Sequence, residues 1–266
     1  MTTRRILVIV PFALDAEGVK RRETQGGYVQ LDAGTELTYR PVACGPTSFM
    51  SPHDWTLMDM AIFEAGMSAE EDGFDAVCID TMSDSGMQAL RSVLSIPVIS
   101  PGRASMLYAL TLGSKFSILA QWEPAIVRYK KAVVEYGLKD QCASIRSFDT
   151  PPDFAALLDG KEEAVFPRMM DAASRCIEED GAEVICLGST TMHQAAAYLA
   201  EMLPVPVINP GPLTYKLAET FLALGLKQGR RAYPSPVVRK DGLIHAMMKG
   251  GAAHEKTSRQ AAGQPG

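Results

Sequence analysis

The stretches that decide the fold are residues 71–82, EDGFDAVCIDTM, and residues 179–190, EDGAEVICLGST. They lie 108 residues apart and share Glu, Gly and Cys at matching places. A second pair follows in the same order, PVISPG at 97–102 and PVINPG at 206–211, at a spacing of 109 residues. Two matching strings in the same order at nearly the same spacing indicate an internal repeat. We therefore interpret the chain as two related halves.

Each half has the same predicted order of elements around that repeat. Continuous apolar runs, typical of buried parallel strands, occur at 6–10, 76–79, 116–120 and 184–187. Ser51 and Pro52 predict a helix start, because Ser is a preferred N-cap and Pro fits the first turn. Pro167 predicts the matching start in the second half, with Met170, Ala173 and Ile177 on one face. Further helices are expected at 84–94 and 190–203, each followed by a Pro-Val-Ile strand.

This alternation predicts an α/β protein with two pseudo-symmetric flavodoxin-like domains, each built on a parallel sheet. The first domain is expected at 1–103 plus 213–266 and the second at 104–212, with the active site in the cleft between them. A helix at about 213–226 should return the chain to the first domain. The tail after Met248 has no apolar periodicity. We expect it to be mobile or to lie along a partner subunit.

Composition narrows the function classes. The chain has 266 residues and a formal net charge of −5, which argues against nucleic acid or anionic membranes as partners. No apolar run is long enough to cross a bilayer, and the run after Arg4-Arg5 is interpreted as a first strand. Five cysteines without CxxC spacing indicate reduced thiols and a cytoplasmic protein. No metal site and no cofactor are predicted.

Two loops rich in hydroxyl groups follow the repeated strands. Residues 81–86 read TMSDSG and residues 188–193 read GSTTMH. Ligands bind at the carboxyl ends of parallel strands, so Thr81 and Ser189 should lie on opposite sides of one bound molecule. Hydroxyl and amide groups there suit a carboxylate or a developing oxyanion. Helix capping is the alternative role of these residues.

Several strings also resemble one family. CLGSTTM (186–192), DTMSDSG (80–86), CGPTSF (44–49), LGSKFSIL (112–119) and VINPGPLTYKLAE (207–219) resemble signatures of the Asp/Glu/hydantoin racemase superfamily, in its hydantoin-racemase-like branch. The resemblance covers roughly residues 4–225. It implies a cofactor-independent racemase or isomerase acting next to a carboxylate or cyclic amide carbonyl. It also implies an anionic or cyclic amide substrate and a homo-oligomer.

The departures from the family pattern concern the chemistry. The two catalytic cysteines of the family correspond here to Thr81 and Ser189, and the family's Asn-Pro-Asn corresponds to Val10-Pro11-Phe12. Arg103 stands in place of an acidic residue and could pair with an anionic substrate group. A thiol with a pKa near ~8.5 is readily made into a base, whereas an aliphatic hydroxyl is not. We therefore expect no enzyme-like racemisation of simple hydantoins, aspartate or glutamate.

The candidate site residues follow from these loops and motifs. The candidate catalytic residues are Thr81, Ser189, His193 and Asp84. The candidate substrate-binding residues are Pro11, Phe12, Ser48, Met82, Ser83, Arg103, Thr190 and Thr191. One alternative is a hydrolase or lyase that uses the hydroxyl groups with an oxyanion hole. A second is a non-catalytic protein for small-anion binding, or an accessory protein of hydrogenase expression.

Overall fold

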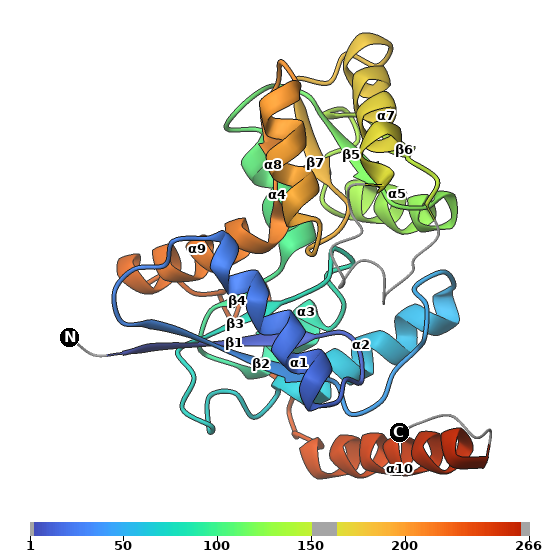
Figure 1. Ribbon diagram of the computed structural model, residues 1–266. Coiled ribbons are helices and arrows are strands. Elements are labelled where there is room, and N and C mark those ends of the chain that lie inside the picture. The colour runs from blue at the N-terminus through green and yellow to red at the C-terminus, as the bar shows by residue number, and fades with distance from the viewer. Residues whose placement is uncertain (1–2, 151–163, 262–266) are drawn as a thin grey trace.

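The computed structural model describes residues 3–150 and 164–261, arranged as two α/β halves (Figure 1). The first half contains β1 (Arg4–Val10), α1 (Ala16–Glu23), the 3₁₀ helix η1 (Thr24–Tyr28), β2 (Thr35–Pro41), α2 (Pro52–Gly66), β3 (Ala76–Ile79), α3 (Met87–Val93), β4 (Val98–Ile99) and α4 (Pro101–Ala109). The second contains β5 (Phe116–Ala120), the 3₁₀ helix η2 (Glu123–Ala125), α5 (Ile126–Glu135), β6 (Cys142–Ser147), α7 (Phe166–Glu178), β7 (Val184–Leu187), α8 (His193–Met202), β8 (Val207–Ile208) and α9 (Pro210–Leu224). Helix α10 (Asp241–Ala261) follows.

The two sheets have the same topology. Their strand orders are β2-β1-β3-β4 and β6-β5-β7-β8, and each neighbouring pair is parallel. Ile6 lies opposite Ala76 in the first sheet and Phe116 opposite Val184 in the second. The prediction of two duplicated flavodoxin-like α/β units with parallel sheets is confirmed.

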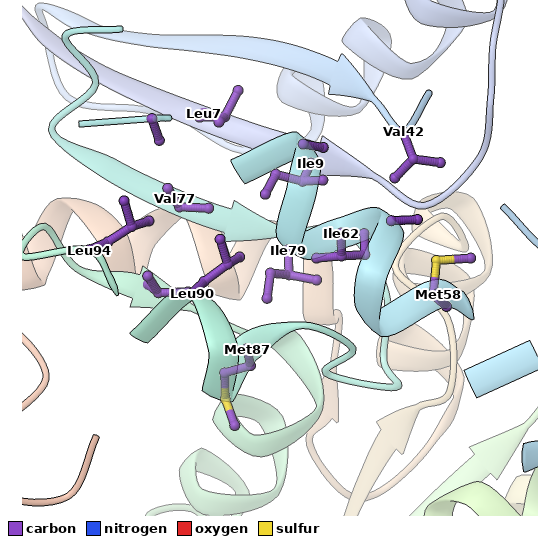
Figure 2. Packing of buried hydrophobic residues seen from close by; sticks show 14 of the residues in the cluster. Leu7, Ile9, Val42, Met58, Ile62, Val77, Ile79, Met87, Leu90 and Leu94 are labelled. Carbon is purple, nitrogen blue, oxygen red and sulfur yellow. The ribbon is translucent and has the colours of Figure 1, made fainter. Parts of the chain in front are cut away.

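The central strands are covered on both faces, which explains their continuous apolar sequences. Leu7, Ile9, Val77 and Ile79 pack against α2 and α3 (Figure 2). The alternate residues of the same strands, among them Ile6, pack on the opposite face against α9. Successive side chains of a strand point to opposite faces, so both sets are buried.

The helix starts depend on caps that the sequence signals. The Ser51 hydroxyl accepts a hydrogen bond from the backbone N–H of Asp54, and the Asp54 carboxylate accepts one from the backbone N–H of Ser51. The two bonds form a capping box at the start of α2. The predicted start of α2 is therefore confirmed. The prediction that Met170, Ala173 and Ile177 share one face of α7 is confirmed: Ala173 is buried, and Met170 and Ile177 are half-buried and pack against the same core. Met169, Ala172 and Cys176 form the rest of the buried face.

The last helix of each half packs on the sheet of the other half. Helix α4 contributes Met106 to the core of the second sheet, and α9 contributes Tyr215 to the core of the first. Figure 1 shows α9 lying between the two sheets. Two buried cysteines contact these helices in equivalent ways. Cys78 Sγ lies 3.7 Å from a backbone oxygen of α9, and Cys186 Sγ lies 3.7 Å from a backbone oxygen of α4. All five cysteines are free thiols, and Cys142 alone among them is only half-buried.

Of the two expectations for the tail, mobility was wrong. Residues 241–261 form α10, which packs along α2 (Figure 1). Met248 is buried in the first core. A Cβ atom at Gly251 would lie 2.9 Å from Cys44 Sγ, so the helix approaches this part of the core closely. The helix docks through only a few residues, among them Met248 and Gly251. It therefore lacks the long apolar stripe by which a helix is recognised in a sequence. Among the described residues, no helix is long and apolar enough to cross a membrane.

Candidate active site

The two hydroxyl loops that follow β3 and β7 have the same internal hydrogen bonds. Thr81 Oγ1 lies 3.1 Å from Ser83 Oγ and accepts the Ser83 N–H at 3.4 Å. Ser189 Oγ lies 3.0 Å from Thr191 Oγ1 and accepts the Thr191 N–H at 3.3 Å. Each loop is thus a turn closed by a hydroxyl group. Because these turns occupy the residues after each strand, α3 and α8 begin three residues later than predicted.

The two loops are in direct contact. Thr190 Oγ1 donates a hydrogen bond to the backbone oxygen of Asp80 at 3.3 Å. Thr81 follows Asp80 and Ser189 precedes Thr190, so both candidate hydroxyl groups lie one residue from this bond. Met82 is buried in the core of the second sheet, and the Arg128 side chain donates to the Ser83 carbonyl. The first loop is therefore held against the second half of the molecule.

Asp84 holds the start of α4. Its backbone is left-handed, with φ 53°. Its carboxylate accepts the N–H groups of Gly102 at 2.8 Å and Arg103 at 2.6 Å, and the Tyr136 hydroxyl at 2.6 Å. Burial raises the pKa of Asp84, and these hydrogen bonds oppose that rise. The residue caps α4, whereas the N-cap of α3 is Gly86.

His193 occupies the corresponding place in the second half. A Cβ at Gly102 would lie 2.8 Å from Asp84 Oδ2, and a Cβ at Gly211 would lie 3.1 Å from His193 Cε1. The His193 Nδ1 lies 3.1 Å from Asn209 Nδ2, and its ring stacks on Tyr28 with centroids 4.5 Å apart. Burial lowers the pKa of His193 to about 4, so the imidazole is neutral at pH 7.

The remaining predicted binding residues lie in several places. Ser48 donates to Asp54 Oδ2 at 2.9 Å and so belongs to the cap of α2. Arg103 donates to Tyr233 Oη at 3.1 Å and lies over the Tyr136 ring. Pro11 is buried at the end of β1. Phe12 packs edge-to-face on Phe49, with centroids 5.4 Å apart. Thus Met82, Ser83, Thr190 and Thr191 lie in the touching loops, while Ser48 and Arg103 are engaged elsewhere.

Sequence reasoning missed three polar residues in α1 and η1. Arg22 forms a buried ion pair with Asp80, with Nη1 3.2 Å from Oδ2. Gln25, three residues further along the chain, is also buried, and the Tyr28 ring stacks on His193. Arg22 belongs to the run Lys-Arg-Arg, which is typical of a solvated helix face. The available signal was Asp80 itself, because an acidic residue at the end of an apolar strand needs a buried partner.

Two cavities lie in the described parts of the second half and at its boundary. The larger, about 610 Å³, lies beside β6 and α7 and contains no residue of either hydroxyl loop. The smaller, about 320 Å³, is lined by Ser83, Asp84, Arg128 and Tyr136, among others. The smaller cavity borders the Thr81 loop at Ser83 and Asp84, but its lining includes neither Thr81 nor any residue of the second hydroxyl loop.

Comparisons with known proteins agree with the fold. The sequence model of the Asp/Glu/hydantoin racemase family matches residues 26–218. A hydantoin racemase of Pseudomonas sp. (strain NS671) is 31% identical over 193 residues, which cover 72% of this chain and 76% of that protein. An allantoin racemase from Klebsiella pneumoniae superposes with a TM-score of 0.78 at 28% identity, covering 89% of this chain and 95% of the other. The allantoin racemase from Pseudomonas fluorescens gives the same TM-score, 0.78, at 26% identity, covering 89% and 98%. The chain belongs to the Asp/Glu/hydantoin racemase family.

Proposed function

We propose that the protein is a cofactor-independent enzyme of the racemase and isomerase type, acting at a carbon next to a carboxylate or a cyclic amide carbonyl. The observation that carries the proposal is the pair of equivalent hydroxyl turns, which meet where Thr190 donates to Asp80. Equivalent loops on two sides of one position suit a reaction at a carbon that becomes planar. The names of the relatives, hydantoin racemase and allantoin racemase, support a cyclic amide as the substrate class.

The hydroxyl groups of Thr81 and Ser189 would bind and polarise the substrate. A hydroxyl group donates a hydrogen bond to a carbonyl or enolate oxygen, but it does not remove a carbon-bound proton at neutral pH. Cys78 and Cys186 do not replace the missing thiols, because both are fully buried and burial raises the pKa of each. The proton must therefore move to another group.

The test follows chirality and mass in D₂O. A panel of 5-substituted hydantoins, allantoin, aspartate and glutamate is incubated with the wild-type protein. It is also incubated with Thr81→Ala, Ser189→Ala and the control Ser92→Ala, whose hydroxyl bonds within α3. Deuterium at the α-carbon with no other mass change, lost in the two loop variants and kept in the control, supports the proposal.

The other outcomes identify the alternatives. A product changed by water or CO₂ indicates a hydrolase or lyase on the same loops. No change across the panel, together with tight binding of an anion in calorimetry, indicates the accessory role. Full inversion of aspartate or simple hydantoins at enzyme-like rates would contradict the argument from the absent thiols.

A further inference from the structure

A buried carboxyl group lies at the end of β3, directly before Thr81. The side chain of Asp80 is 1% exposed, and its partner is the guanidinium group of Arg22 at 3.2 Å. Burial raises the pKa of Asp80, while the charge of Arg22 and the hydroxyl of Thr190 oppose that rise. Buried ion pairs contribute little net stability, so stability alone does not explain this one.

The equivalent position in the second half carries no carboxyl group. Gly188 stands 108 residues after Asp80, at the same place before its hydroxyl residue. A Cβ atom at Gly188 would lie 2.8 Å from Leu119 O and 3.0 Å from Tyr129 Oη, so no side chain fits there. The duplicated fold therefore forms this loop without a carboxyl group. The carboxyl of Asp80 distinguishes the two sides of the site.

A neutral imidazole lies on the other side. His193 is 5% exposed, and its Nε2 atom is buried with no hydrogen-bond partner among the described residues. When the Asn209 amide donates to Nδ1, the ring proton is on Nε2. Such an N–H donates to an oxygen on which charge develops and does not have to lose its proton.

Arg22 connects the two groups. It pairs with Asp80, and its charge contributes to the lowered pKa of His193. Arg22, Gln25 and Tyr28 follow at intervals of three residues, a spacing that places them on one side of the α1–η1 segment. Tyr28 stacks on His193. Arg22 Nε and Gln25 Oε1 are also buried without hydrogen-bond partners in the described chain, so both atoms are able to bond a polar ligand.

We propose that Asp80 is the base of this site and that His193 is its neutral hydrogen-bond donor. This inference rests on the proposed function. The Asp80 carboxylate takes the proton from the carbon next to the carbonyl, and the C–H electron pair becomes the C=C bond of an enolate. The carbonyl oxygen takes the negative charge and accepts the His193 N–H. Return of the same proton from Asp80 to carbon restores the substrate, whereas exchange of the Asp80 carboxyl proton with solvent before that return gives the exchanged form.

Two consequences follow from the geometry. Gly188 offers no base on the opposite face, so the proton returns to the face from which it came. Exchange with solvent while configuration is retained is therefore faster than inversion. Asp80 is buried beneath Arg22, so a substrate reaches it only when the α1–η1 segment moves and Tyr28 separates from His193.

The test measures exchange and inversion together. Single enantiomers of allantoin and 5-benzylhydantoin are incubated in D₂O near neutral pH, with protein-free samples subtracted. Wild-type protein should incorporate one deuterium with retained configuration. Asp80→Asn should lower the exchange rate by at least about 100-fold. The control Glu219→Gln should stay within about two-fold, because Glu219 is also buried and paired, with Lys216, but lies on α9 away from the loops.

A second variant covers the case in which Asp80→Asn does not fold. The Asp80 carboxyl is influenced by Arg22 from α1, Tyr39 from β2, Cys78 from β3, the Thr190 hydroxyl of the second loop and Tyr215 from α9. Arg22 alone among them carries a positive charge. Arg22→Gln should raise the pKa of Asp80 and shift the acid limb of the exchange rate to higher pH.

Four results decide the inference. A folded Asp80→Asn protein that exchanges at the wild-type rate overturns it, and so does an acid limb that Arg22→Gln leaves unmoved. Equal rates of exchange and inversion in wild-type protein show two bases and also overturn it. Absence of wild-type exchange on every probe refutes the proposed function itself, and the inference with it.

Discussion

Protonation of His193 should destabilise the protein as the pH falls below about 6.5. Burial lowers the pKa of the folded imidazole from 6.5 to about 4; the hydrogen bond with Asn209 opposes this shift, and the charge of Arg22 adds a smaller contribution to it. The unfolded chain therefore binds this proton first, and the stability present above pH ~6.5 is lost as the pH approaches ~4. A shift of that size corresponds to about 3 kcal/mol in total and to about 2 kcal/mol by pH ~5.

Urea unfolding of wild-type protein and His193→Gln isolates this contribution. Other titrating groups are common to both proteins, so the difference between their free energies of unfolding reports on His193. That difference should shrink by about 2 kcal/mol between pH ~7.5 and pH ~5. A difference that stays constant over this range would show that the imidazole is not held neutral, and would remove the basis for its role as a neutral donor.

Three further outcomes follow from the contacts. Thr81→Ala and Ser189→Ala should each lower the free energy of unfolding by only about 1 kcal/mol yet abolish turnover or ligand binding; full activity in both would make the hydroxyls simple caps. Asp84→Ala leaves three donors without their acceptor and should lower the free energy of unfolding in urea by about 3–5 kcal/mol. A decrease below ~1 kcal/mol would contradict its capping role. Met248→Ala should lower the free energy of unfolding by about 2–4 kcal/mol. An unchanged midpoint of thermal unfolding would show that α10 is not docked on α2.

The sheets were predictable because their sequences carry the signal locally. The strands at 76–79, 116–120 and 184–187 coincide with β3, β5 and β7, since central parallel strands are apolar without interruption. The edge strand β2, residues 35–41, was not predicted. Its sequence TELTYRP is mostly polar, and its residues are largely half-buried or exposed. Only pairing with β1 identifies it as a strand.

The candidate site was predictable in its position but not in its polar contacts. The repeat placed Thr81 and Ser189 at equivalent strand ends, and the two loops meet. The partners of the buried charges were not predictable, because they depend on tertiary contacts. Arg22 reaches Asp80 across 58 residues of sequence. Asp84 caps a helix that begins beyond the next strand, so its role could not be derived from the local sequence around α3.

The duplication also explains why the differences between the halves carry information. A site built from two equal loops treats the two faces of a substrate alike, as a reaction with one base on each face requires. Here the equivalent positions have diverged, with Asp80 opposite Gly188 and Asp84 opposite His193. Thr81 and Ser189 preserve the symmetry of the two loops, since both close the same hydroxyl turn. On the proposed mechanism, recognition therefore remains two-sided while proton transfer has become one-sided, so exchange should outpace inversion.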